Sequence, residues 1–131
     1  NLYRLMLADE GTVNIPEVKP DLSAQQLLTM TWLEGQKLMD WLATEPSQEQ
    51  RNQVAMNMFR AWYIPFYFYG VIHGDPHLGN YSIDKDLKIN LLDFGSIRIF
   101  RPEFVAGVID LYKALRDKDN KLAYMIGHQT F

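Results

Sequence analysis

The sequence contains no cysteine, which excludes disulfide bonds and thiolate metal sites among its 131 residues. It has no long apolar run, because the longest, residues 61–72, is too short to span a bilayer and includes Pro65. Positive charge is not in excess, since 13 Lys and Arg stand against 16 Asp and Glu. No basic stripe is visible, so we expect no nucleic-acid partner. The first residues, beginning at Asn1, show no signal-peptide pattern.

What is present favours one globular unit with a real core. Hydrophobic residues make up 47% of the chain and aromatic residues 13%, with a formal net charge of -3. The chain begins with Asn1 rather than methionine, and its last helical pattern stops without a clear partner. We therefore expect both ends to be cut points within a longer protein.

Two polar clusters interrupt apolar sequence in the middle of the chain. The first is His-Gly-Asp-Pro-His-Leu-Gly-Asn at residues 73–80, and the second is Asp-Phe-Gly at residues 93–95. Between them, residues 81–83 and 87–92 predict two short strands around a polar turn. A hairpin of this length carries the chain out and back, so the second cluster should return close to the first.

The residue types in these clusters are those of a phosphoryl-transfer site. Asp75, Asn80 and Asp93 would then converge as oxygen donors, the set that a hard cation such as Mg²⁺ prefers. Kinase-like enzymes place an Asp, an Asn five residues later, a hairpin and then Asp-Phe-Gly. The first Asp orients the attacking hydroxyl or water, and the Asn and second Asp hold metal against nucleotide phosphates. ATP and Mg²⁺ are therefore the expected cofactors.

Other interpretations of the same residues remain open. Asp and Asn are common turn residues, although their joint occurrence with the hairpin favours the metal site. We expect His73 to be structural, holding the loop by hydrogen bonds to backbone or to Asp93. His77 is balanced between packing and a phosphate contact, and we include it with Asp75 among the catalytic candidates. A zinc site formed by His73, Asp75 and His77 is disfavoured because no fourth ligand lies nearby in the sequence.

The rest of the chain predicts helices and a few short strands. The expected strands are residues 13–18 and 26–32. The expected helices are residues 1–8, 37–43, a long helix from Ser47 to Gly70 with a Ser47–Gln50 capping box, a helix from Pro102, and a last helix from Lys121. The side chains expected to face the core are Leu38, Trp41, Leu42, then Val54, Met58, Trp62, Phe66, then Phe104, Val108, Leu111 and Leu115.

The two clusters together resemble the signature of the AarF/UbiB family of atypical kinase-like proteins. Residues 27–35 are similar to the family's strand and hinge between two lobes, and residues 13–18 to the strand before it. The resemblance implies an α+β, truncated protein-kinase-like fold, with a mostly helical large lobe, a β-hairpin carrying the active site and two residual small-lobe strands. Residues 1–35 would be the C-terminal remnant of the small lobe plus hinge, and residues 36–131 a partial large lobe.

The resemblance also implies a function. Asp75 would position the nucleophile, Asn80 and Asp93 would bind magnesium, and backbone at Thr31 and Leu33 would receive adenine. The partners would be nucleotide and isoprenoid-lipid or quinone-pathway proteins, with peripheral membrane association through other parts of a full protein. The location would be intracellular, in the bacterial cytoplasm or at the cytoplasmic face of the inner membrane.

Departures from the family pattern keep alternatives in view. Thr31 stands where a glutamate is expected, and no glycine- or alanine-rich loop, strand lysine or partner glutamate precedes it. We therefore expect this piece to be inactive alone. A small-molecule phosphotransferase of the aminoglycoside or choline type also uses His-Gly-Asp with a later Asn and Asp. A non-catalytic nucleotide-binding or scaffold module is the third interpretation, and the aromatic run at residues 62–69 would suit a partner surface.

Overall fold

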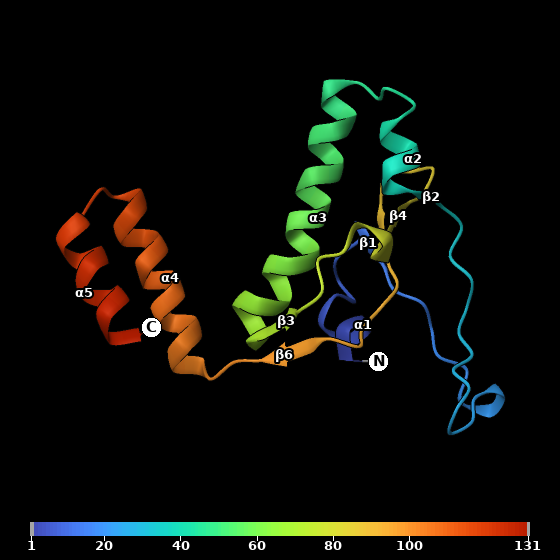
Figure 1. The fold of residues 1–131 in the computed structure, drawn as a ribbon, viewed down its shortest axis with the longest axis horizontal. Helices are drawn as coiled ribbons and strands as arrows, with labels where there is room; N and C mark the ends of the chain where they lie inside the picture. Colours follow the sequence, from blue (N-terminus) through green and yellow to red (C-terminus); the bar gives the residue numbers. More distant parts are fainter. Residues whose placement is uncertain (1, 131) are drawn as a thin grey trace.

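A 22-residue helix and the two small sheets beside it organise the protein (Figure 1). The structure is a computed structural model that describes residues 2–130, apart from the side chains of the last two. The helices are α1 (Leu2–Met6), α2 (Leu38–Leu42), α3 (Gln48–Tyr69), α4 (Pro102–Arg116) and α5 (Asn120–Thr130), with short 3₁₀ turns at Pro20–Leu22 and Leu78–Asn80. The strands are β1 (Val13–Asn14), β2 (Gln36–Lys37), β3 (Val71–His73), β4 (Tyr81–Ile83), β5 (Ile89–Leu91) and β6 (Ile97–Ile99).

The predicted hairpin is confirmed and forms the centre of the larger sheet. Its strands β4 and β5 are antiparallel, with Tyr81 opposite Leu91. The sheet order is β1-β5-β4-β2, so β1 pairs in parallel with β5 and β2 lies at the opposite edge. A second sheet pairs β3 with β6, with His73 opposite Ile97. These last two strands, each of three residues, were not predicted.

The sequence predicted both ends of α3 correctly from the residues at those ends. The Gln50 amide donates to Ser47 Oγ at 3.2 Å, and the Ser47 amide donates to Gln50 Oε1 at 2.9 Å, which completes the predicted capping box. Gly70 ends the helix in the left-handed region with φ 64°. The chain then turns directly into β3 and the first polar cluster.

The buried face of α3 differs from the predicted one. Its fully buried residues are Val54, Asn57, Ala61 and Pro65. Three of the predicted residues are therefore only half-buried, namely Met58, Trp62 and Phe66. The reason is a polar contact that periodicity cannot register: Asn57 is 2% exposed and its Nδ2 donates to the Leu87 carbonyl at 2.8 Å. This bond turns the helix so that an asparagine faces the hairpin.

One hydrophobic core joins α1, β1, α3 and the hairpin. Its central side chains come from the hairpin, where Tyr81 is 1% exposed and Ile89 and Leu91 are 0% exposed. Tyr3 and Val54 close it from α1 and α3. The hairpin that follows the first polar cluster is therefore packed in one core with α1 and α3. This packing holds the loops at the ends of its strands in place.

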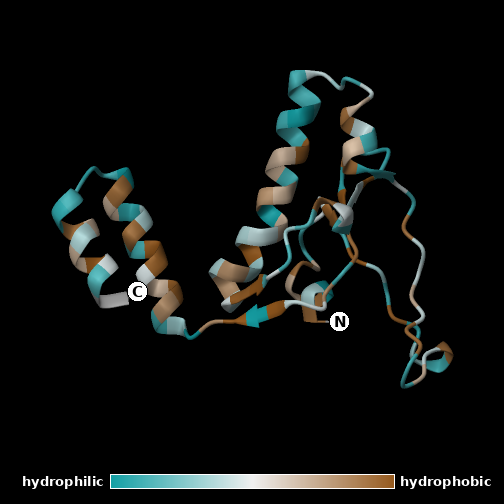
Figure 2. Ribbon diagram, viewed as in Figure 1, coloured by the Kyte–Doolittle hydropathy of each residue, from teal (hydrophilic) through white to brown (hydrophobic). Residues whose placement is uncertain are grey.

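The predicted strand at residues 26–32 is wrong. This part of the chain is an extended arm with isolated bridges at Val18–Met30 and Ala24–Leu27, on the right of Figure 1. Leu27 and Leu28 are each 61% exposed, and Figure 2 shows apolar residues along the arm. Segments joined only by isolated bridges, with leucines this exposed, gain too little burial to form a regular sheet. The predicted strand 13–18 is likewise reduced to β1.

The predicted core faces of the shorter helices are partly wrong. Leu42 and Leu115 are 39% and 57% exposed, whereas Val105 and Ala114 are the buried residues of α4. α4 packs mainly against α5, to the left of the body in Figure 1. The small Ala114 therefore occupies the face that the sequence assigned to leucines. Across the described residues, no helix combines the length and apolar character needed to cross a bilayer.

Candidate functional site

The loop between β3 and β4 brings Asp75 and Asn80 together. Asn80 Nδ2 donates to Asp75 Oδ2 at 3.1 Å and to the Asp75 carbonyl at 3.4 Å. The other carboxylate oxygen, Asp75 Oδ1, accepts from the His77 amide at 3.2 Å. Two of the predicted site residues thus form one hydrogen-bonded pair, because the five-residue spacing closes the loop on itself.

His77 is exposed, and its ring supports the same loop. Its Nδ1 accepts from the Gly79 amide at 3.1 Å. A Cβ at position 79 would lie 2.9 Å from that nitrogen, so a larger residue there would displace the His77 ring. Because Nδ1 accepts, Nε2 carries the proton in the neutral ring and points to no protein partner among the described residues.

His73 links the first polar cluster to the second. It is 1% exposed, and its Nε2 hydrogen-bonds the Asp93 carbonyl. A carbonyl can only accept, so Nε2 is the donor and Nδ1 accepts from the Asp75 amide at 3.4 Å. The rings of Tyr3, Trp62 and Phe94 surround it. The prediction that His73 holds the loop is confirmed.

The hairpin returns the second cluster beside the first. The Leu92 amide donates to the Asn80 carbonyl at 3.2 Å, so the residue before Asp93 is paired with the end of the loop. The Asp93 carboxylate itself is exposed and accepts from the Gly95 amide at 2.8 Å. It hydrogen-bonds neither Asp75 nor Asn80. Within the described residues, no three His, Cys, Asp or Glu side chains gather as a ready metal cluster.

The two predicted adenine contacts lie on the segment that follows the arm. The Thr31 amide donates to the Glu17 carbonyl at 2.9 Å, and Thr31 Oγ1 accepts from the Glu17 amide at 2.9 Å. The Thr31 carbonyl and the Leu33 amide have no hydrogen bond within the described part of the chain. These two backbone groups are therefore available to a ligand.

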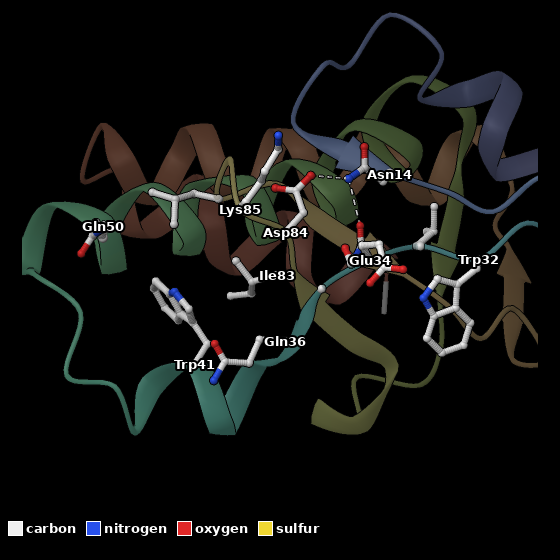
Figure 3. Close-up of a pocket in the computed structure, with 13 residues that line it drawn as sticks. Asn14, Trp32, Glu34, Gln36, Trp41, Gln50, Ile83, Asp84 and Lys85 are labelled. Atoms are coloured by element: carbon white, nitrogen blue, oxygen red, sulfur yellow. Dashed lines mark hydrogen bonds between the residues drawn. The ribbon is translucent and has the colours of Figure 1, made fainter.

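Two cavities flank the hairpin. One of about 620 Å³ contains Asp93, with Phe94 and Gly95. Its remaining lining is mostly apolar and comes from α1, the arm and the strand ends: Leu2, Tyr3, Arg4, Ile15, Pro16, Val18, Leu28, Met30, Leu92 and Ile97. The other cavity, of about 830 Å³, lies at the turn of the hairpin and is shown in Figure 3. Leu33 lines it, but Asp75, His77, Asn80 and Asp93 do not.

A buried polar network beside the cavity at the hairpin turn was missed by the sequence reasoning. Asn90 is 0% exposed; its Nδ2 donates to the Glu34 carbonyl and to Ser82 Oγ, each at 2.9 Å. Its Oδ1 accepts from Asn14 Nδ2 at 2.9 Å. A Cβ on Gly35 would lie 2.6 Å from Asn90 Nδ2, so this close approach needs glycine. An asparagine within the apolar run of β5 was the signal that could have revealed it.

Tyr81 connects the core to the loop. Burial raises the pKa of its phenol, the hydrogen bond that Trp62 Nε1 donates to its oxygen at 2.8 Å partly offsets this rise, and the negative charge of Asp75 raises the pKa again. The phenol therefore stays neutral at physiological pH. It places a polar group close to the Asp75 carboxylate without adding a charge to the site.

Comparison with known proteins gives a family match across the chain. The model described as the ABC1 atypical kinase-like domain matches residues 2–126. The mitochondrial atypical kinase COQ8 of Saccharomyces cerevisiae is 28% identical over 133 residues, covering 98% of this chain and 26% of the relative. The mitochondrial atypical kinase COQ8B of Rattus norvegicus is 30% identical over 137 residues, with coverages of 98% and 26%. The chain thus spans about a quarter of the length of these relatives.

Solved structures support the kinase-like fold. Rv3197 of Mycobacterium tuberculosis, solved with erythromycin, superposes with a TM-score of 0.74 at 22% identity, covering 95% of this chain and 31% of that one. The bifunctional kinase-methyltransferase WbdD superposes with a TM-score of 0.52 at 22% identity, covering 84% and 26%. At these identities the likeness concerns the fold alone, and the mixed α+β arrangement matches the predicted class.

Proposed function

This chain belongs to the ABC1 atypical kinase-like family, and we propose from that premise that it supplies the metal-binding and nucleophile-positioning segment of an ATP-dependent phosphoryl-transfer site. The observation that carries the proposal is the Asp75–Asn80 pair, closed by a 3.1 Å hydrogen bond. In phosphoryl transfer the protein acts chiefly by positioning and by stabilising charge, which a hydrogen-bonded acidic loop beside the proposed metal ligands would supply.

The donor atoms of the site fit Mg²⁺. Asn80 uses Nδ2 to hold Asp75, which leaves its Oδ1 for a cation. Asp93 uses Oδ1 to accept from Gly95, which leaves Oδ2. Both are hard oxygen donors of the kind that Mg²⁺ prefers, so these two side chains would hold the ion together with a nucleotide. When bound, the ion would neutralise phosphate charge between these two residues.

The remaining predicted residues receive positioning roles in the proposal. The Asp75 carboxylate would orient the attacking hydroxyl or water. The protonated Nε2 of His77 would donate to a phosphate oxygen, because its Nδ1 is occupied by Gly79. The Thr31 carbonyl and the Leu33 amide would receive adenine, as an acceptor and a donor respectively. His73 would hold the loop of residues 73–80 next to the segment of residues 93–95.

We extend the proposal to the whole protein by family. Residues 1–35 would be the end of a small lobe plus hinge, and residues 36–131 the first part of a large lobe. The complete protein would use ATP and Mg²⁺ inside the cell in ubiquinone or other isoprenoid-lipid metabolism, at a membrane surface or in the adjoining cytoplasm. This chain alone would bind nucleotide weakly and turn it over negligibly.

Manganese is a suitable probe, because it replaces Mg²⁺ and broadens nearby NMR signals. In a ¹⁵N-labelled sample with ATP, added Mn²⁺ should broaden the amides of Asp75, of residues 77–80 and of residues 93–95 before the others. Asp93→Asn should abolish this pattern, and Asp86→Asn, which removes an exposed turn carboxylate, should preserve it. Broadening centred elsewhere, or an unchanged pattern in Asp93→Asn, would refute the metal role.

Calorimetry measures how tightly the chain binds the nucleotide. Titration of the chain with MgATP should give an affinity weaker than micromolar, because the lysine that contacts phosphates in the family is not part of this sequence. Micromolar binding, or measurable hydrolysis of ATP, would contradict the proposal that the segment depends on other parts of the kinase-like fold.

A further inference from the structure

A single side chain joins the strand that leads to Asp93 with the segment proposed to receive adenine. Asn90 lies on β5, three residues before Asp93, and its Nδ2 donates to the Glu34 carbonyl at 2.9 Å. Glu34 directly follows Leu33, whose amide is the proposed adenine donor. One hydrogen bond between residues 56 positions apart therefore connects the two halves of the proposed nucleotide site.

The backbone between Thr31 and β2 has few other attachments. At one end Thr31 is hydrogen-bonded to the segment that follows β1, and at the other end β2 pairs with β4. Between these anchors Trp32 is 83% exposed, so its burial contributes little to holding the segment. Within the described part of the chain, the backbone of Leu33 and Glu34 has no hydrogen bond other than the one from Asn90. The position of the Leu33 amide therefore depends on this side chain.

Asn90 is itself fixed through every hydrogen-bonding group of its side chain. Its Nδ2 also donates to Ser82 Oγ at 2.9 Å, and its Oδ1 accepts from Asn14 Nδ2 at 2.9 Å. Asn14 in turn donates to Asp84 Oδ2 at 2.8 Å, as Figure 3 shows. Because Asn90 is 0% exposed, water cannot replace these partners, and the amide cannot rotate without leaving buried polar groups unpaired.

The backbone beside Glu34 is shaped to accept this contact. A Cβ on Gly35 would lie 2.6 Å from Asn90 Nδ2 and 3.0 Å from the Ile83 carbonyl. Because the second contact is with the backbone of β4, rotation of a side chain could not relieve it. A larger residue at position 35 would therefore displace the segment from β5. The glycine and the asparagine together set the distance between the segment and the strand.

The connection from Asn90 to the proposed metal ligands is equally short. Two residues separate Asn90 from Asp93, and the second of them, Leu92, donates its amide to the Asn80 carbonyl at 3.2 Å. Three residues of extended chain span roughly 10 Å. The path from the adenine segment to both metal ligands thus consists of one side-chain hydrogen bond and a few residues of paired strand.

We propose that Asn90 is a positioning residue of the nucleotide site, which holds the Leu33 amide at a fixed place relative to Asn80 and Asp93. The inference rests on the proposed function, because it concerns the same bound nucleotide. Asn90 acts through the Glu34 backbone and not by touching the nucleotide. A segment that is ordered before the nucleotide arrives loses less conformational entropy on binding. Without the bond, adenine should bind more weakly, whereas phosphate and metal should bind as before.

Backbone relaxation of the ¹⁵N-labelled chain tests the positioning without any nucleotide. In the native chain, the amides of residues 33–35 should have order parameters like those of β4 and β5, about 0.85. In Asn90→Ala these order parameters should fall below about 0.6, while those of residues 93–95 change little. Unchanged order in residues 33–35 would overturn the proposal, whether or not the chain binds nucleotide.

Ser82→Ala is the matched control, because it also removes one hydrogen bond of Asn90 but leaves the bond to the Glu34 carbonyl in place. Both variants should be less stable in urea, but only Asn90→Ala should release residues 33–35. Gly35→Ala keeps Asn90 and displaces the segment, so it should release the same residues, and it replaces Asn90→Ala if that variant does not fold. Equal loss of order in Ser82→Ala would overturn the proposal, since general destabilisation would then explain the effect.

Ligands that carry one half of the nucleotide complete the test. In an NMR titration adenosine should shift the Leu33 amide, and Asn90→Ala should weaken its binding about fivefold, the cost of ordering the segment on binding. Mn²⁺ with inorganic triphosphate, which has no adenine, should broaden residues 93–95 equally in both chains. Equal binding of adenosine to both chains would overturn the role of Asn90 alone. If adenosine left Leu33 unshifted in the native chain, the proposed adenine contact would be wrong and the role of Asn90 would fall with it.

Discussion

Asn90 is the residue on which the polar centre of the larger sheet depends. Replacing it with alanine would leave Asn14 Nδ2 without one of its acceptors and the Glu34 carbonyl and Ser82 Oγ without their donor. Because these groups are buried or half-buried, Asn90→Ala should lower the free energy of unfolding by about 2–3 kcal/mol. Urea unfolding measures this.

The control for that prediction is Asn52 on α3. Its side chain also accepts a hydrogen bond, from Gln48 at 2.7 Å, but on an exposed helix surface. Asn52→Ala should therefore change the free energy of unfolding by less than about 0.5 kcal/mol. If Asn90→Ala proved equally mild, the network would not stabilise the sheet.

Tyr3 has the opposite character, since its hydroxyl is buried and meets no hydrogen-bond partner in the described part of the chain. Tyr3→Phe removes that unsatisfied group and keeps the ring, so it should raise the free energy of unfolding by about 1 kcal/mol. The matched variant Tyr81→Phe deletes the acceptor of the Trp62 indole and should lower it by a similar amount, about 1 kcal/mol. Urea unfolding measures both variants. If both changed the free energy of unfolding in the same direction, the two hydroxyls would not differ in hydrogen bonding as described.

The same two phenols give the chain an alkaline limit. Burial raises the pKa of Tyr3 and the pKa of Tyr81 above their ordinary value in the unfolded chain. Above about pH 10 the unfolded chain loses these protons first, so the folded state binds more protons and stability falls as pH rises. Below that pH the contribution is complete. Urea unfolding from neutral to strongly alkaline pH should show the decline, and Tyr3→Phe should reduce its slope.

At the scale of elements, two glycines distinguish a helix end from a helix interior. Gly70 has φ 64° at the end of α3, and a Cβ there would lie 3.0 Å from the Phe100 carbonyl. Gly70→Ala should therefore cost about 1–2 kcal/mol. Gly127 lies within α5 with nothing within 4 Å of an added Cβ, so Gly127→Ala should stabilise by up to about 1 kcal/mol. Thermal unfolding of both variants should show shifts of opposite sign.

The polar loop is itself an element whose form follows from its sequence. Asp75, His77 and Asn80 bond one another and nearby amides within a few residues. Such short-range contacts are encoded in consecutive residues, so the motif could be recognised and placed without a structure. The position of the Asp93 carboxylate was not predictable in the same way, because it depends on how far the hairpin twists before it returns.

At the scale of the whole molecule, the α4–α5 pair is attached less firmly than the hairpin. α4 packs mainly on α5 and meets the remainder chiefly along α3, and Leu122 and Tyr124 stay exposed. The central sheet and α3 share the hydrophobic core. Amides of α4 and α5 should therefore exchange with deuterium at least about tenfold faster than those of β4 and β5. Equal protection across all of these elements would show a single cooperative unit instead.

The sequence by itself determined the features that neighbouring residues encode. The hairpin, the capping box at Ser47, the helix end at Gly70 and the His73–Asn80 loop were all predicted, because each depends on turn chemistry, capping or periodicity within a short window. The family resemblance drew on the same local motifs, which is why it was available from the sequence.

Only the tertiary structure decided which residues meet across the chain. It selected Asn57 rather than Met58 as the residue of α3 that faces the hairpin, and it joined Asn14 to Asn90 across 76 positions. It also left the arm at residues 26–32 without a regular strand. The physical reason is that burial and hydrogen bonding are satisfied between distant segments, whose relative placement no short window of sequence contains.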